Sequence, residues 1–109
     1  MENDERLDAV FFALSDKRRR LLLAELAAGP RSVSELATIT GMKLSATSKH
    51  IALLEAGSLL FKTRHKREVY CHLNFDVWQE VTSYIAMHAK FWSGRIDELE
   101  AHLKDTGAR

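Results

Sequence analysis

The stretch "SVSELATITGMKLSATSKHIALLEAG", residues 32–57, decides the fold because it encodes two short helices separated by a tight turn. Ser32 and Glu35 have the spacing of a capping box, in which each side chain satisfies a backbone amide in the other's turn. They predict a first helix over about 33–39, and Gly41 should end it. A second helix follows within three residues, so the stretch is predicted to be a helix-turn-helix.

The second helix of this stretch has two different faces. On a helical wheel, the side expected to face the core holds Leu44, Thr47, Ile51 and Leu54. The opposite side holds Ser45, Ala46, Lys49 and His50. Small residues allow a helix to approach a DNA groove closely, whereas a face meant only for solvent usually carries long charged side chains. Read alone, the pattern is compatible with a recognition helix and with an ordinary solvated face.

Two further helices are expected before this stretch. The apolar spacing of "LDAVFFAL" predicts a helix over residues 7–14. Asp16 is a candidate N-cap for a helix over about 17–28, which Gly29 and Pro30 should stop. The apolar face of that helix is expected to hold Leu21, Leu22 and Leu26.

A β-hairpin and a long helix are expected after it. β-branched and aromatic residues in "LLFKTR" and "EVYCHL" predict two strands with a basic tip, "HKR", between them. From Asn74 on, an apolar stripe predicts nearly thirty residues of helix, which exceeds what one small core can cover. We therefore interpret the aromatic-rich terminal helices as a dimer interface, with a packed core or a ligand pocket as the alternatives. The stripe consists of Trp78, Val81, Ile85, His88, Trp92, Ile96, Leu99 and Leu103.

Composition indicates one soluble domain in a reducing compartment. A chain of 109 residues, 46% hydrophobic and 28% charged, suits a single self-supporting domain, and no apolar run approaches the roughly 18 residues of a membrane span. The N-terminus lacks the pattern of a signal peptide, and the single cysteine, Cys71, has no partner for an internal disulfide. We therefore expect a cytoplasmic protein with no membrane partner.

The net charge of +1 conceals a strong segregation of charge along the chain. Residues 17–73 hold eleven Lys and Arg against four Asp and Glu, a net +7, between ends of −4 and −2. Within the predicted hairpin the basic residues are Lys62, Arg64, His65, Lys66 and Arg67. A basic middle of this kind is typical of a surface that meets a polyanion, and a positive ribbon suits phosphates or a minor groove.

These pieces together resemble the ArsR-type bacterial transcription regulators over about residues 7–103. The resemblance rests on "ALSDKRRRLLLAEL", residues 32–57, "EVYCHL" and the late "FW-x-x-R-I-D-x-L" segment, and Ser48, His50 and Ile51 are its most specific part. It implies a mainly α winged helix-turn-helix, one domain over 1–109, that dimerises through its N- and C-terminal helices. It also implies a homodimeric repressor that binds double-stranded DNA at an inverted repeat and is released by a signal.

The resemblance assigns residues to two surfaces. The helix-turn-helix spans 32–57 and the wing 59–73, and the implied DNA-contacting residues are Lys43, Ser45, Ala46, Thr47, Ser48, Lys49, His50, Lys62, Arg64, His65, Lys66 and Arg67. Ser48 is expected to touch phosphate or to support packing. The dimerising helices are 7–15 and 74–104, and the implied interface residues are Leu7, Val10, Phe11, Trp78, Val81, Ile85, His88, Trp92, Ile96 and Leu99.

The chain departs from the family pattern at the ends of the predicted recognition helix. Lys43 stands where a capping Ser is usual, which leaves the N-cap of this helix open. Gly57 and Ser58 replace the usual Ala-Gly, so the left-handed residue is expected one place early and the wing could be re-aimed. Lys17 replaces the Pro that usually opens the preceding helix, and the wing tip lacks a Gly.

No metal, cofactor or catalytic centre is expected. The Cys-x-Cys pair of family metal sensors is absent from "SVSELAT", and His88 and His102 lie about 21 Å apart along one helix. Cys71 and His72 point to opposite faces of a strand, and there is no phosphate-binding Gly loop or His-Glu-x-x-His motif. The alternatives that remain are a metal or redox sensor of the same family, with ligands shared between subunits, and a winged-helix module that binds a protein.

Overall fold

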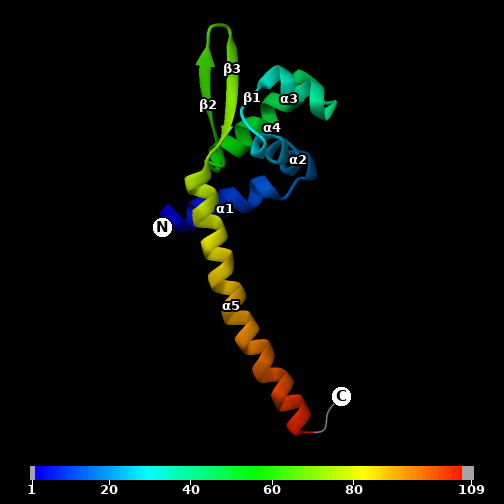
Figure 1. The fold of residues 1–109 in the computed structure, drawn as a ribbon, viewed down its shortest axis with the longest axis vertical. Helices are drawn as coiled ribbons and strands as arrows, with labels where there is room; N and C mark the ends of the chain where they lie inside the picture. Colours follow the sequence, from blue (N-terminus) through cyan, green and yellow to red (C-terminus); the bar gives the residue numbers. More distant parts are fainter. Residues whose placement is uncertain (1, 107–109) are drawn as a thin grey trace. The chain divides into compact units, whose positions relative to one another are not determined.

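The computed structural model describes residues 2–106, with side chains from residue 4. The expected order of four helices, a hairpin and a long helix is confirmed, and a short extra strand precedes the third helix (Figure 1). The elements are α1 (Glu2–Leu14), α2 (Lys17–Ala27), β1 (Arg31–Ser32), α3 (Val33–Thr40), α4 (Leu44–Ala56), β2 (Leu60–His65), β3 (Glu68–Leu73) and α5 (Phe75–Asp105). The chain forms one compact unit up to Val77 and a second from Trp78 on. No helix within residues 2–106 is long and apolar enough to cross a membrane.

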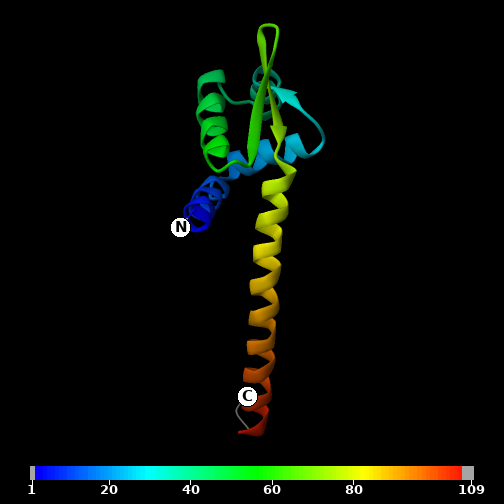
Figure 2. The ribbon, with the colours of Figure 1, turned by 90° about the vertical axis from the view of Figure 1, so that its left-hand side faces the viewer.

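The strands form a three-stranded antiparallel sheet in the order β1-β3-β2. Figures 1 and 2 show the β2–β3 hairpin standing beside the helices, with its tip projecting beyond them. Directly opposite residues share a face of the sheet, so Lys62 and Cys71 lie on one face, and Phe61 and His72 on the other. Cys71 is fully buried, which identifies its face as the one that packs on the helices.

The core of the first unit comes from one apolar face of each short helix and the root of the hairpin. Its largest fully buried side chains are Leu22, Leu26, Leu36, Ile51, Leu54, Leu59 and Leu60. Two residues expected in this core are exposed, Leu21 at 44% and Leu44 at 55%. Leu23 takes the place of Leu21 in the buried set of α2, and Leu44 is the first residue of α4, one turn before the buried part of that helix.

The predicted caps of α2 and α3 are confirmed. The Asp16 carboxylate accepts a hydrogen bond from the Arg18 backbone N–H at 2.7 Å, and the Arg18 guanidinium helps to lower the pKa of Asp16 to about 2. Ser32 and Glu35 form the complete capping box, at 2.8 and 3.1 Å. Ser32 is also the second residue of β1, so this one residue ends a strand and starts a helix.

Helix α4 begins without a side-chain cap. Lys43 occupies the N-cap position in an extended conformation, but its side chain makes no capping hydrogen bond. The Lys43 carbonyl instead accepts two hydrogen bonds from Thr47, one from the backbone N–H and one from the hydroxyl, both at 2.9 Å. The buried Thr47 therefore secures the first turn of α4 from within.

The other end of α4 corrects the expected position of the left-handed residue. Gly57 has φ −86°, whereas Ser58 has φ +60°, so the left-handed residue does not lie one place early. A Cβ on Gly57 would lie 3.2 Å from the Ala9 carbonyl oxygen and 3.4 Å from the Val10 Cα. Glycine is favoured at position 57 because the backbone of α1 passes close to it, while Ser58 adopts the conformation that glycine usually provides.

Helix α5 is one continuous helix of 31 residues. The predicted stripe falls along it, and its large apolar side chains from Ile85 to Leu103 are exposed in the single chain. Two other residues assigned to a dimer interface, Val10 and Val81, are almost completely buried in the single chain. They are therefore not available to a partner in this conformation, which corrects the predicted interface at those two positions.

We expect Gly57→Ala to lower the free energy of unfolding by about 1–3 kcal/mol, because the new methyl group meets backbone rather than a flexible side chain. Chemical denaturation at one fixed protein concentration measures it. Gly94→Ala is the matched control, since Gly94 lies inside α5 with no atom within 4 Å of its added Cβ. That control should gain about 1 kcal/mol, and equal effects of the two changes would contradict the close approach of α1.

Candidate nucleic-acid interface

Helix α4 presents a small, polar and basic surface on the side opposite the core. Ser45, Ser48 and Lys49 are exposed, and Ala46 and His50 are half-buried. Thr47 is fully buried and cannot reach a ligand on this surface, so the structure removes it from the expected DNA contacts. Its place on the buried side of the wheel already indicated this.

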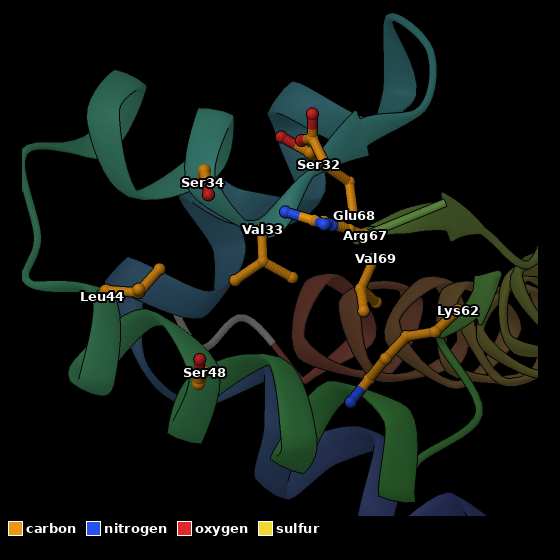
Figure 3. Close-up of a pocket in the computed structure, with 9 residues that line it drawn as sticks. All are labelled: Ser32, Val33, Ser34, Leu44, Ser48, Lys62, Arg67, Glu68 and Val69. Carbon is orange, nitrogen blue, oxygen red and sulfur yellow. The ribbon is translucent and has the colours of Figure 1, made fainter. Parts of the chain in front are cut away.

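A hollow of about 340 Å³ lies between α3, α4 and the hairpin, next to this surface. In Figure 3 the Ser34 hydroxyl, the Ser48 hydroxyl and the Arg67 guanidinium lie around it, and Leu44 forms part of its wall. Its lining residues are Ser32, Val33, Ser34, Leu44, Ser48, Lys62, Arg67, Glu68 and Val69. Hydroxyl and guanidinium donors are the groups that bind phosphate oxygens. The exposure of Leu44 follows from its position at this hollow.

The basic residues of the hairpin have different surroundings. Lys62 forms an ion pair with Glu55 of α4 at 3.1 Å, which ties the hairpin to that helix. Arg64 lies on the same face as Lys62, and His65 on the other. Lys66 and Arg67 form the turn at the tip, where Lys66 has φ +59° in place of the missing glycine. The turn residues Lys66 and Arg67, followed by His65 and Arg64, are the part of this basic group that projects farthest along the hairpin.

His50 has a partner that sequence reasoning missed. Its Nδ1 lies 3.3 Å from Nη1 of Arg19, a residue of α2 that is only 6% exposed. The Arg19 Nε and Nη2 donate to the carbonyl oxygens of Ala13 and Phe12, at 2.7 and 3.0 Å, in the last turn of α1. The run of three arginines showed only added charge in the sequence, because nothing local indicates that the middle one turns inward.

Arg20 also caps the C-terminal end of α1. Its Nη1 donates to the Leu14 carbonyl oxygen at 2.6 Å, so arginines of α2 satisfy carbonyls at the last three positions of α1. Basic side chains at a helix C-terminus also complement the negative end of the helix dipole. Arg19 and Arg20, which belong to the positive charge counted in residues 17–73, therefore bind carbonyl oxygens of α1.

Three further candidate ligands, His72, His88 and Cys71, have other partners or are buried. Within residues 2–106, no three His, Cys, Asp or Glu side chains gather in a group that could hold a metal ion. His88 contacts the Tyr84 ring on its own helix, and His72 stacks on Phe61 with a centroid distance of 4.8 Å. Cys71 is fully buried, and burial raises the pKa of its thiol. The thiol lies on the face of the sheet that packs on the helices.

A helix-turn-helix followed at once by a hairpin that carries basic residues defines a winged helix-turn-helix DNA-binding fold. A family model for bacterial regulatory proteins of the ArsR family matches residues 16–57, which contain α2, α3 and α4. The solved structure of an ArsR family transcriptional regulator is similar, with a TM-score of 0.74 and 32% identity over 81% of this chain and 97% of that one. The chain belongs to the ArsR family of transcription regulators.

Two further solved structures are similar to this chain, one over nearly its whole length and one over most of it. An ArsR-like transcriptional regulator from Rhodococcus sp. RHA1 has a TM-score of 0.79 and 26% identity, covering 99% of this chain and 98% of its own. A homodimeric winged helix-turn-helix DNA-binding domain from Mycobacterium bovis has a TM-score of 0.67 and 27% identity, covering 83% and 84%. A comparison with curated proteins found no match.

We expect the Cys71 thiol of the native protein to react with a thiol reagent such as DTNB at least about tenfold more slowly than in the unfolded chain, because the reactive thiolate is disfavoured by burial. Absorbance after mixing measures the rate, and the same protein in guanidinium chloride is the control. Equal rates would show that the thiol is accessible.

Proposed function

We propose that this chain is a homodimeric, sequence-specific regulator, a repressor that binds an inverted-repeat operator in the cytoplasm. The observation that carries the proposal is the arrangement of the exposed face of α4, the hollow and the basic hairpin along one side of the first unit. In this proposal α4 lies in a major groove and the hairpin lies beside it on the neighbouring backbone.

The donors around the hollow support its assignment as a site that contacts the DNA phosphate backbone. A helix in a major groove is flanked by phosphates, and the hollow borders α4 with donors from three different elements. Ser34 and Ser48 supply hydroxyls, and Arg67 supplies a guanidinium. We therefore assign Ser48 and Arg67 to phosphate, and Ser45, Ala46 and Lys49 to base edges.

The exposed stripe of α5 supports self-association. Side chains as large as Trp92 and Ile96 are more than half exposed in the single chain, and exposed apolar surface of this extent marks an interface. A similar domain is described as homodimeric. We propose that residues 1–109 act as one domain, with 7–15 and 74–104 joining two copies. Two-fold symmetry then sets half-sites apart by about one turn of 10 bp or a multiple of it.

No observation in the described residues favours either alternative, the protein-binding module or the metal or redox sensor. A protein-binding role would leave the basic face unexplained, since residues 43–67 carry a net charge of +5. A metal or redox sensor of this family would require ligands or a second thiol from a partner subunit, and Cys71 is buried. Equilibrium binding of zinc or nickel to the dimer is the test of the sensor.

We expect the protein to bind its own upstream DNA more tightly than a scrambled duplex. Fluorescence anisotropy at several salt concentrations measures both affinities. The double change Lys66→Asn with Arg67→Gln should weaken binding to both duplexes and reduce the slope of log K against log salt by about 2, because two phosphate contacts are lost. Asn at position 66 tolerates the positive φ, so the hairpin keeps its shape.

The matched control removes two lysines elsewhere, Lys90→Gln with Lys104→Gln on α5, and should leave the slope unchanged. A wing variant with wild-type affinity and slope would remove the hairpin from the interface. Equal binding to both duplexes by the unmodified protein would remove sequence specificity.

We expect Trp92→Glu with Ile96→Glu to convert a dimer into a monomer, because each change places a charge in the apolar stripe of α5. Sedimentation equilibrium should show the molar mass fall by about half. Lys90→Glu is the control, since position 90 lies on the opposite side of the helix. A dimer that persists in the double variant would exclude the stripe as the interface.

A further inference from the structure

One buried guanidinium links the end of α1 to the exposed face of α4. The Arg19 side chain is 6% exposed, and its three nitrogens each have a partner, namely the carbonyls of Ala13 and Phe12 and the His50 ring. Its central carbon also lies 5.2 Å from the centre of the Phe12 ring. The contacts with α1 thus hold the guanidinium in position beside the His50 ring.

The chemistry of arginine decides where the His50 proton lies. A guanidinium has five N–H donors, accepts no hydrogen bond and keeps its proton at any ordinary pH. The contact between Arg19 Nη1 and His50 Nδ1, at 3.3 Å, is therefore a hydrogen bond only if Nδ1 is the acceptor. A neutral imidazole with an unprotonated Nδ1 carries its hydrogen on Nε2.

We propose that Arg19 is a positioning residue that holds His50 in the Nε2–H tautomer, so that α4 offers DNA a hydrogen-bond donor at this position. The inference rests on the proposed function. A donor at this point selects an acceptor, such as guanine O6 or N7 or a phosphate oxygen, and rejects the amino groups of adenine and cytosine. Arg19 acts on specificity without touching DNA itself.

The tautomer can be measured without DNA. Long-range proton–nitrogen NMR on protein labelled with ¹⁵N-histidine should show His50 as a single neutral tautomer, with the hydrogen on Nε2. Arg19→Met keeps an unbranched side chain and removes the donors, and its His50 should become a mixture of tautomers. A hydrogen on Nδ1 of His50 in the unmodified protein would overturn the proposal, whatever the variant does.

Two substitutions of His50 separate its contact with Arg19 from its contact with DNA. Asn places an acceptor oxygen where Nδ1 lies, and Gln places an N–H donor where Nε2 lies. We expect His50→Asn to keep the melting temperature but to lose about tenfold in affinity for the upstream duplex, as one hydrogen bond to DNA is worth. His50→Gln should keep the affinity within about twofold but melt about 4 °C lower, because an Arg19 donor loses its partner.

A purely structural histidine would make the affinity follow the melting temperature in both variants, and that result would overturn the proposal. The scrambled duplex identifies the acceptor. A tenfold loss for His50→Asn on both duplexes indicates a phosphate, and a loss confined to the upstream duplex indicates a base. If the unmodified protein binds neither duplex, the proposed function fails, whereas a wrong tautomer in a protein that binds DNA overturns only the role of Arg19.

Discussion

The hydrogen bonds of Arg19 are the interaction on which the arrangement of the first unit depends. They join the last turn of α1, the start of α2 and the exposed side of α4 through one buried side chain. A buried charge is tolerated only when its donors are satisfied, and each donor left without a partner costs about 1–3 kcal/mol. Any rearrangement of α1 against α4 must therefore break these bonds together, which favours one definite geometry.

The hairpin is attached by a different kind of interaction. Cys71, Leu59 and Leu60 are buried at its root, and the Lys62–Glu55 ion pair connects it to α4. Both partners of that pair are partly exposed, so the pair orients the hairpin more than it stabilises the fold. The root is held by the core, whereas the tip projects beyond the helices, as Figures 1 and 2 show. Position along the hairpin thus separates residues that fix the wing from residues that are free to contact a ligand.

Local patterns in the sequence were enough to predict most of the fold and the outer face of α4. The Asp16 cap, the capping box and the period of the two strands depend on residues a few positions apart, and all three are confirmed. The errors concern contacts between distant segments. Gly57 lies close to the backbone of α1, and the Arg19 side chain contacts α1 and His50. Neither contact is visible in the local sequence. A helical wheel also could not show that Leu44 lies before the core begins.

The contact between Gly57 and α1 has a mechanical consequence. The backbone of Gly57 lies against the backbone of Ala9 and Val10 there, and Gly57 has no side chain that could change rotamer and absorb a displacement. Packed elements of this kind shift as units rather than deform continuously. A tilt of α1 would therefore carry the C-terminal end of α4 with it, so a displacement at α1 would reach the helix that the proposed function places in the DNA groove.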